Sequence, residues 1–267
     1  MSEVQPLVGR VAIVTGAGRG LGRAMTLGLA KAGAMVVATA ARERSEVEGV
    51  AGETGAPGRV VPVVADVRSE EDCARAVATA LDRFGRLDIL VNNAGRGMKY
   101  VSESFMTEPT RFWETPPDVW QLVIDTNVVG PFLMARAAVP PMLAARWGRI
   151  INISMNAETM RRRGFSPYGP SKAALESATI IWALDLAGTG VTVNALLPGG
   201  ATLTGMIPQN FPEHSRATLL DPAIMVPPLL WLAGTKSDGV TGKRFVAAEW
   251  REDVEVSGAA GAAAAGW

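Results

Sequence analysis

The 267-residue chain is 48% hydrophobic, and its 26 lysines and arginines balance its 26 aspartates and glutamates. This much apolar sequence is enough for a substantial core and excludes a largely disordered chain. The net charge of zero argues against nucleic acid or an anionic membrane surface as the main partner.

Seven short runs rich in Val and Ile predict β-strands. They lack the strict alternation of half-exposed strands, as expected of parallel strands that are covered on both faces. In chain order the runs span residues 11–16, 35–40, 60–66, 87–95, 149–154, 191–200 and 243–248.

Helix signals lie between the predicted strands. Ser69 followed by Asp72 resembles a capping box, and Gly85 ends that segment. Residues 115–118 and the pair Asp221-Pro222 mark two further helix starts. Strand–helix alternation from end to end predicts one doubly wound α/β domain, with a central seven-stranded parallel sheet, right-handed crossovers and flanking helices.

The predicted domain covers residues 1–256, because no internal repeat or linker divides it. The Gly/Ala-rich end at 257–267 is expected to be a flexible tail, or else Trp267 docks on a neighbouring subunit.

Cys73 is the single cysteine and His214 the single histidine of the chain. We therefore expect no intrachain disulfide and no metal site. A Ser-His-Asp triad would have to use His214, which lies in the Pro-rich stretch PQNFPEH and is better explained as a surface or loop residue. The chain begins without a signal-peptide pattern and has no apolar run near 18 residues, so a cytoplasmic location is expected.

The stretch TGAGRGLG at 15–22 follows the first predicted strand and opens a helix. Gly16, Gly20 and Gly22 let the chain turn tightly and let the backbone approach a pyrophosphate at the helix N-terminus. In this strand–turn–helix setting, the loop predicts dinucleotide binding.

The residues after the second strand favour NADP(H) as the dinucleotide. An acid about twenty residues beyond the loop would hold the ribose 2′-hydroxyl of NAD, but Ala40 and Ala41 stand there, followed by Arg42. Arg19 and Arg42 together have the chemistry to bind a 2′-phosphate. The alternative is that both arginines are solvated surface charges.

Tyr168 and Lys172, in SPYGPSKAAL, stand one helical turn apart. At that spacing they share a helix face, and a cation beside a phenol lowers its pKa. Such a pair also arises often by chance, so other motifs must decide whether it is catalytic.

Six motifs together resemble the short-chain dehydrogenase/reductase family, and the resemblance covers nearly the whole chain. They occur in the family's order: TGAGRGLG at 15–22, Asp66-Val67, NNAG at 92–95, Asn127 in DTNVVG, Tyr168-x-x-x-Lys172, and PGG at 198–200. The resemblance implies a Rossmann fold, an oxidoreductase activity and a homotetramer, or a homodimer.

The resemblance also implies catalytic roles. Tyr168 would give its proton to the substrate oxygen while NADPH delivers hydride to the carbon, and Lys172 would bind the nicotinamide ribose and depress the Tyr168 pKa. Asn127 would hold a water that links the lysine to solvent. Thr204 or Thr202 would contact the nicotinamide carboxamide. The predicted cofactor set is Gly16, Gly18, Arg19, Gly20, Leu21, Gly22, Arg42, Asp66, Val67, Asn93, Ala94, Gly95, Tyr168, Lys172, Pro198, Gly199, Thr202 and Thr204.

Met155 departs from the family pattern, because the catalytic serine normally stands at this position, thirteen residues before the tyrosine. Methionine is no useful hydrogen-bond donor to a carbonyl oxygen. Three interpretations are open. In the first, Ser154 or Asn156 turns inward and replaces the missing serine. In the second, the substrate, such as an imine, needs less hydrogen-bond support at oxygen, and in the third the activity is impaired.

Two segments are expected at the substrate side of the cleft: the long stretch 96–115 and a mobile lid at 202–220. Each aromatic or Met side chain in them either lines an apolar pocket or packs within its own loop. The candidate pocket residues are Met155, Asn156, Phe105, Phe112, Trp113, Met206 and Phe211.

The leading hypothesis is an NADP-dependent reductase of a small-molecule ketone, or the reverse alcohol dehydrogenase. Reduction of another C=N or C=C bond is an alternative within the same fold. Because Met155 replaces the usual serine, a catalytically impaired protein that binds NADP as a sensor is a further alternative. The presence of Tyr168, Lys172 and Asn127 argues against a nonenzymatic scaffold.

Overall fold

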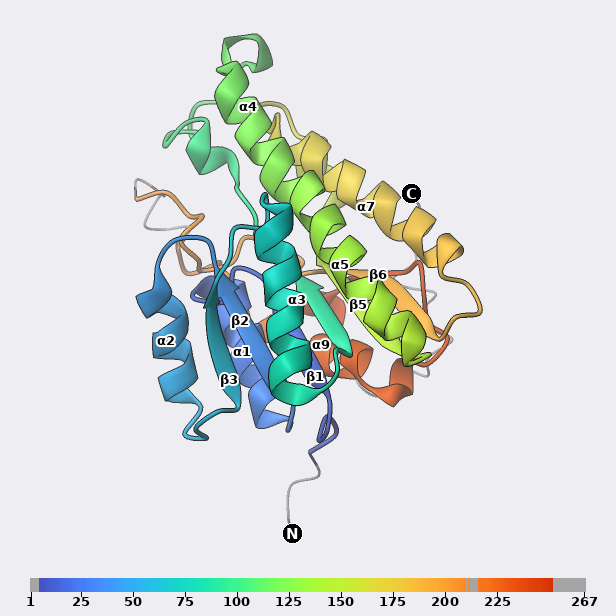
Figure 1. The fold of residues 1–267 in the computed structure, drawn as a ribbon. Coiled ribbons are helices and arrows are strands. Elements are labelled where there is room, and N and C mark those ends of the chain that lie inside the picture. The colour runs from blue at the N-terminus through green and yellow to red at the C-terminus, as the bar shows by residue number, and fades with distance from the viewer. Residues whose placement is uncertain (1–4, 210, 212–215, 252–267) are drawn as a thin grey trace.

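A single seven-stranded parallel sheet forms the centre of the molecule, in the computed structural model that describes residues 5–209, 211 and 216–251 (Figure 1). The strand order is β3-β2-β1-β4-β5-β6-β7, as in a doubly wound fold. The strands are β1 (Val11–Val14), β2 (Met35–Ala40), β3 (Val60–Val64), β4 (Ile89–Asn92), β5 (Gly148–Ile153), β6 (Val191–Leu197) and β7 (Arg244–Val246). The predicted fold class is confirmed, and each observed strand overlaps a predicted one, although β5 begins one residue before its predicted range. His214 and the tail 257–267 lie outside the described residues.

Helices cover both faces of the sheet. Helices α3, α5 and α7 lie on one face, and α1, α2 and α9 contribute to the core on the other (Figure 1). The helices are α1 (Gly20–Lys31), α2 (Arg44–Glu53), α3 (Glu70–Phe84), α4 (Pro117–Ile124), α5 (Gly130–Ala144), α6 (Ala157–Met160), α7 (Tyr168–Asp185) and α9 (Val226–Ala233).

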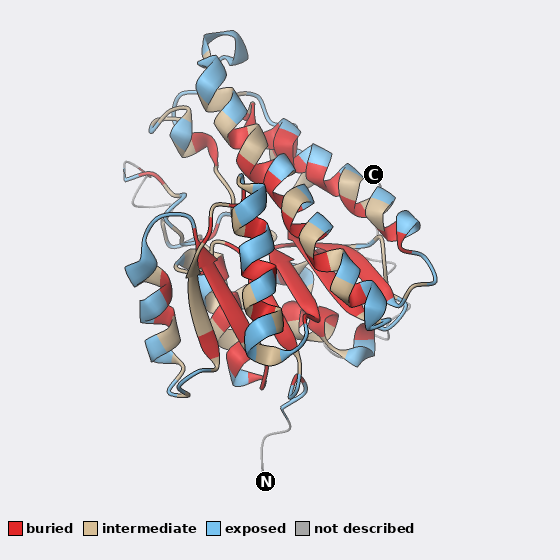
Figure 2. Cartoon of the chain, viewed as in Figure 1, coloured by how far each residue is buried: buried red, intermediate tan, exposed pale blue. Residues whose placement is uncertain are grey.

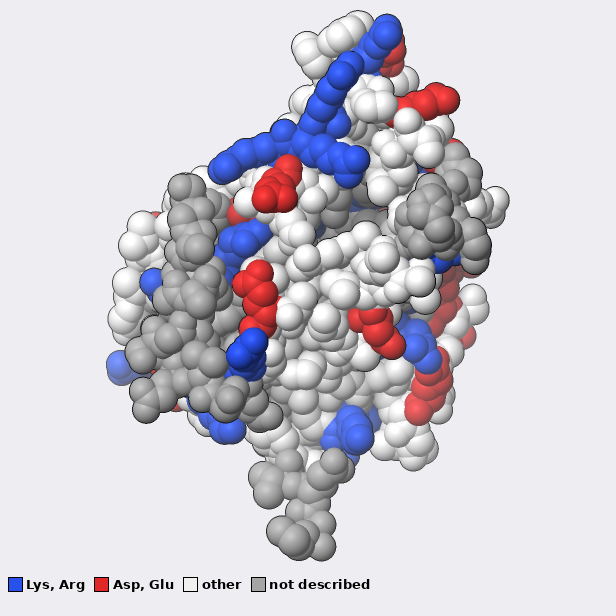
Figure 3. All heavy atoms as spheres, turned by 180° about the vertical axis from the view of Figure 1, so that it is seen from behind, with Lys and Arg blue, Asp and Glu red and all other residues white. Residues whose placement is uncertain are grey.

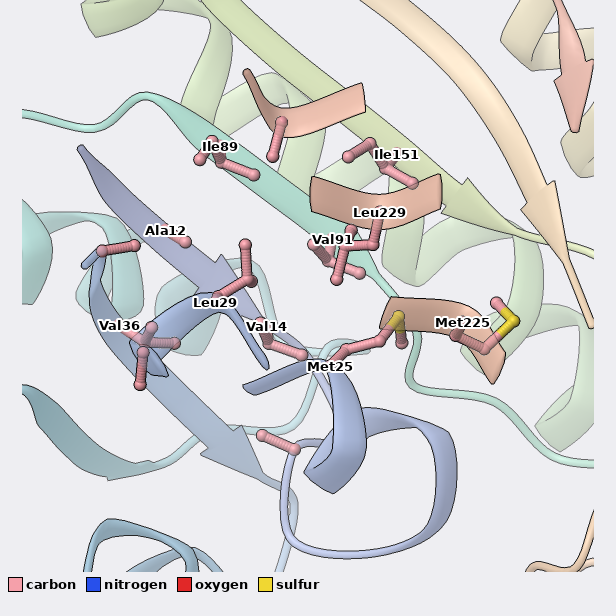
Figure 4. Packing of buried hydrophobic residues seen from close by; sticks show 14 of the residues in the cluster. Ala12, Val14, Met25, Leu29, Val36, Ile89, Val91, Ile151, Met225 and Leu229 are labelled. Carbon is pink, nitrogen blue, oxygen red and sulfur yellow. The ribbon is translucent and has the colours of Figure 1, made fainter. Parts of the chain in front are cut away.

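The five central strands, β2, β1, β4, β5 and β6, are buried on both faces, which explains their unbroken apolar character, whereas the edge strands β3 and β7 are partly exposed (Figure 2). Along β1, Ala12 and Val14 pack in one core with Leu29 of α1 (Figure 4). Val11 and Ile13 point the other way, into the core beneath α3 and α5. Alternate residues of one strand therefore bind both helical layers to the sheet.

Local signals in the sequence set the limits of α3. The Ser69 side chain accepts a hydrogen bond from the Asp72 amide at 3.2 Å, and Gly85 ends the helix with φ 75°. Such a left-handed residue favours glycine, so both predicted limits are confirmed.

Helices α4 and α5 form one continuous helical run, joined by a π-helical turn at Asp125–Val129. By length and hydropathy alone this run, Pro117–Ala144, is able to span a membrane, but 44% of its most apolar window is buried inside the protein. A core helix passes the same test, so the run is weak evidence for a membrane segment.

The substitution Leu29→Ala tests the packing of α1 on the sheet. We expect it to lower the free energy of unfolding by about 2–5 kcal/mol, because this fully buried side chain would leave a cavity. The control Leu203→Ala removes a side chain that is 58% exposed and should cost far less. Urea denaturation measures both, and equal losses would contradict the described core.

Candidate active site

A cavity of about 720 Å³ opens at the carboxyl ends of the central strands. This is where ligands bind in doubly wound sheets. Of the predicted cofactor residues, those that line it are Gly16, Gly18, Arg19, Gly20, Leu21, Gly22, Asp66, Val67, Asn93, Ala94, Gly95, Tyr168, Lys172, Pro198, Thr202 and Thr204.

The glycine-rich loop is packed so tightly that its glycines leave no room for side chains. A Cβ on Gly22 would lie 2.1 Å from the Gly16 carbonyl oxygen, and one on Gly16 would lie 2.9 Å from the Ala94 Cα. The N-cap side chain of α1, Arg19, makes no capping hydrogen bond within the described structure. The first-turn amides are therefore accessible to an anion, and the loop fits a dinucleotide pyrophosphate.

Asn93 and Thr15 fasten the NNAG segment to the glycine-rich loop. The Asn93 amide group donates to the carbonyl oxygens of Thr15 and Gly16 at 2.8 and 3.0 Å. The Thr15 hydroxyl accepts from the backbone amides of Asn93 and Ala94, both at 3.0 Å. Two of the predicted motifs therefore form one rigid wall of the cavity.

At the other end of the cavity, Ala40, Ala41 and Glu46 surround the expected position of the adenosine ribose. Glu46, which the sequence analysis missed, lies 3.6 Å from a guanidinium nitrogen of Arg19. Arg42 is exposed and does not line the cavity, so in this geometry Arg19 alone of the two predicted arginines faces the dinucleotide site.

Tyr168 and Lys172 stand on the first turns of α7 and both line the cavity. The Lys172 ammonium is buried and donates to the Ile153 carbonyl oxygen at 2.7 Å. It lies 6.0 Å from the centre of the Tyr168 ring. The lysine is therefore held between the phenol and the end of β5.

The expectation that Lys172 lowers the Tyr168 pKa is not met, because the shift goes the other way. Burial raises the pKa of Tyr168 to about 12. Burial also lowers the pKa of Lys172 to about 8, while the negative charge of Glu176 opposes that change. The Tyr168 shift is caused by desolvation, because a phenol removed from water is favoured over the charged phenolate.

Asn127 lies in the π-helical turn, fully buried behind the cavity wall. Its side chain accepts from the Arg96 amide at 2.8 Å and donates to the Arg96 carbonyl at 2.9 Å. It also donates to the Ser171 hydroxyl, which in turn donates to the Tyr168 carbonyl oxygen. Asn127 thus connects the loop after NNAG to the start of α7.

Ser154 lines the cavity, but its hydroxyl proton is already engaged within the protein. Its hydroxyl donates to the Glu176 carboxylate at 2.5 Å. Arg244 donates to the same carboxylate oxygen at 3.0 Å and to the Met155 carbonyl oxygen at 2.9 Å. The sequence analysis missed both partners, although an acid four residues after Lys172 on α7 was a usable signal.

Met155 itself belongs to an apolar cluster around Tyr168, with Met98, Met160 and Phe165 buried beside it. Asn156 lines the cavity and donates to the Gly199 carbonyl at 2.9 Å. An amide nitrogen carries two hydrogens, so Asn156 keeps a second donor. Gly199 itself does not line the cavity.

The predicted pocket residues divide into two groups. Met206 and Phe105 line the cavity together with Met155 and Asn156. Phe112 and Trp113 do not: they are 64% and 68% exposed and contact each other edge to face. Phe211 is buried but also lies outside the lining. The lining residues that sequence reasoning missed include Glu46, Met98, Met106, Thr159, Arg162 and Phe165.

The chain belongs to the short-chain dehydrogenase family, whose model it matches over residues 10–214. Members of this family are oxidoreductases that use NAD(H) or NADP(H). Two curated relatives illustrate the likeness. A 3-oxoacyl-[acyl-carrier-protein] reductase of Synechocystis is 39% identical over 194 residues, 72% of this chain and 74% of that protein. A fluoren-9-ol dehydrogenase of Terrabacter is 31% identical over 265 residues, 92% of this chain and 73% of that protein.

The solved structures agree with these relatives. A 3-ketoacyl-(acyl-carrier-protein) reductase from Brucella melitensis, complexed with NADH, is 32% identical and superposes with a TM-score of 0.77. The match covers 88% of this chain and 95% of that one.

The substitution Glu176→Gln tests the buried charge beside Lys172. The amide keeps an acceptor for Ser154 and Arg244 but removes the charge that raises the Lys172 pKa. The lysine should lose its proton at lower pH, so the alkaline limb of the kcat/KM profile should move down by roughly one pH unit. Glu48→Gln, an exposed change of the same kind, is the control, and an unmoved profile in Glu176→Gln would contradict the coupling.

Proposed function

We propose that this protein is an NADP-dependent reductase of small-molecule ketones, with the reverse alcohol oxidation open to it. The observation that carries the proposal is the buried Lys172 beside Tyr168, in the same cavity as the phosphate-binding loop. Burying an ammonium group raises the free energy of the folded state unless the group is paired or hydrogen-bonded. Its position between the phenol and the end of β5, at the wall of the same cavity, supports a role beside Tyr168.

Tyr168 is the proton donor in this proposal. With a pKa near 12 the phenol is fully protonated at neutral pH and is ready to protonate a carbonyl oxygen. NADPH, when bound in this cavity, would supply the hydride for the carbonyl carbon. The Lys172 cation lowers the free energy of the phenolate that Tyr168 becomes. Since the Lys172 pKa is about 8, this support is present below pH 8 and is lost above it.

Other residues hold the reactants in place. The amides of the glycine-rich loop would bind the pyrophosphate, and Asp66 and Val67, which line the cavity, would lie beside the adenine. Thr202 and Thr204 also line the cavity, and either hydroxyl would suit the nicotinamide carboxamide. Asn127 is proposed to order a water that returns a proton to Lys172 from solvent.

The variant Tyr168→Phe is expected to lower kcat for ketone reduction by roughly 10²- to 10⁴-fold, because the proton donor is removed. NADPH binding, followed by fluorescence, should stay nearly unchanged. Full activity in this variant would overturn the mechanism.

Asn156 is the better of the two proposed substitutes for the missing serine. The Ser154 hydroxyl is already donated to Glu176, whereas Asn156 keeps one free N–H at the cavity. Met155 supports two alternatives. One is a substrate, such as an imine, that needs less hydrogen-bond support at oxygen, and the other is an impaired enzyme that senses NADP.

The variants Met155→Ser and Asn156→Ala test this assignment. The first should raise kcat/KM for ketones roughly tenfold or more, because a second donor reaches the developing oxyanion, and the second should lower it by a similar factor. If Met155→Ser raises kcat/KM for ketones but not for a panel of cyclic imines, the result supports an imine as the substrate. An unaffected Asn156→Ala enzyme would remove Asn156 from the mechanism.

The preference for NADPH is proposed to rest on Arg19, which lines the cavity and pairs with Glu46. A guanidinium fork suits a 2′-phosphate, and that phosphate would displace the half-buried Glu46 carboxylate from Arg19. Arg42 contributes less, since its side chain stands outside the lining.

The variant Arg19→Ala should raise the KM for NADPH roughly tenfold and leave that for NADH nearly untouched. Arg42→Ala should have a smaller effect in the same direction. Glu46→Gln should lower the NADPH KM, because it removes a negative charge beside the phosphate site. Equal effects of Arg19→Ala on both cofactors would contradict the preference.

The assembly is proposed to be a homotetramer, or a homodimer, in the cytoplasm. Phe132 on α5 and Ile181 and Leu184 on α7 are 49%, 53% and 70% exposed. An exposed apolar surface of this kind supports burial against a second copy. A stable monomer at micromolar concentration in sedimentation would contradict this assembly.

A further inference from the structure

Three consecutive arginines, Arg161, Arg162 and Arg163, follow α6 between the Met155 position and Tyr168. All three are exposed, and Arg162 lines the cavity. No carboxylate of the described residues forms an ion pair with any of them. In Figure 3, Lys and Arg side chains gather at the top of one face, above a hollow in the surface.

Of the other cations at the cavity, Arg19, Lys99 and Lys172 have polar partners. Arg19 pairs with Glu46 at 3.6 Å, Lys99 lies 3.7 Å from Glu103, and Lys172 donates to a backbone carbonyl. The half-buried Arg96 lies over the Tyr100 ring at 4.4 Å, and its Nε has no hydrogen-bond partner among the described residues. Within the described part of the chain, the exposed Arg162 guanidinium has no carboxylate or carbonyl partner, so its charge is available to a bound molecule.

Arg162 is tied closely to the catalytic tyrosine. Its carbonyl oxygen accepts from the Phe165 amide at 3.2 Å, and the Phe165 carbonyl accepts from the Gly169 amide at 2.6 Å. Its guanidinium carbon lies 5.3 Å from the Phe165 ring centre, and Phe165 packs in the apolar cluster with Met155 and Tyr168. One aromatic side chain therefore separates the cation from the apolar floor beside the phenol.

We infer that the substrate is a carbonyl compound with an apolar middle and an anionic group, a carboxylate or a phosphate, at the end remote from the carbonyl. Arg162 binds that group, and Arg161 and Arg163 add to the positive field at the mouth. Guanidinium groups bind both anions through paired hydrogen bonds, and a charged mouth speeds the approach of an anion in low salt. The inference rests on the proposed reductase function.

Matched substrates test the inference. A medium-chain methyl ketone ending in a carboxylate is compared with its methyl ester, and a keto-alkyl phosphate with the corresponding acetate ester. The wild-type kcat/KM should favour each anion by roughly tenfold, and the preference should shrink at high salt. The larger of the two preferences tells whether a carboxylate or a phosphate is the natural group.

The variant Arg162→Gln should remove most of the anion preference, through KM rather than kcat, and leave the neutral esters unchanged. Arg83→Gln, which removes an exposed arginine of α3, is the matched control. An equal loss in Arg83→Gln would show a general charge effect and overturn the inference. So would equal use of acid and ester by the wild type, which leaves the reductase function standing.

A binding measurement separates the two proposals if no ketone is reduced. Calorimetry on the NADPH complex compares dodecanoate and dodecyl phosphate with dodecanol. Tighter binding of the anions that is lost in Arg162→Gln supports the anion site without any turnover, and equal binding overturns it. A change of sedimentation in Arg162→Gln without a change of binding would assign the arginines to a subunit contact and likewise overturn the inference.

Discussion

The carboxyl end of β5 is held by three hydrogen bonds to three successive residues, and the reacting groups depend on it. Lys172 binds the Ile153 carbonyl, Glu176 binds the Ser154 hydroxyl, and Arg244 binds the Met155 carbonyl while also contacting Glu176. Two of these partners stand one turn apart on α7, the helix that carries Tyr168. The same contacts that fix the strand end therefore fix the phenol relative to the cavity floor.

The arrangement holds two cations, Lys172 and Arg244, and one anion, Glu176, away from water. Lys172, Glu176 and the Arg244 side chain are largely removed from water, with side-chain exposures of 17% and 4% for the arginine and the glutamate. Removing one partner of such a set leaves an uncompensated buried charge, which is strongly destabilising. The network thus holds the site in one geometry. It also occupies Ser154, which explains why a serine directly beside the Met155 position does not replace the missing donor.

Much of the fold was predictable because it depends on local rules. Unbroken apolar runs mark strands buried on both faces, and Ser69 and Gly85 mark the limits of a helix. The glycine loop was also predictable, since only glycine fits where a Cβ on Gly22 would meet a carbonyl oxygen at 2.1 Å.

The parts that could not be predicted depend on contacts between distant segments. Arg244 reaches a carbonyl 89 positions away, and Glu46 reaches the glycine loop from α2. The Tyr168 pKa was predicted with the wrong sign, because sequence spacing shows the cation but not the depth of burial. Residue type left two positions open for Trp113, the pocket or its own loop, and its contact with Phe112 within the loop shows the second.

The most direct test of this account is a crystal structure with NADPH and an unreactive ketone analogue, in which the position of the carbonyl oxygen is measured. The account predicts that this oxygen lies within about 2.6–3.2 Å of the Tyr168 hydroxyl, with the Asn156 amide as a second donor and Ser154 still bound to Glu176. A carbonyl oxygen held away from Tyr168 by other groups would contradict the account.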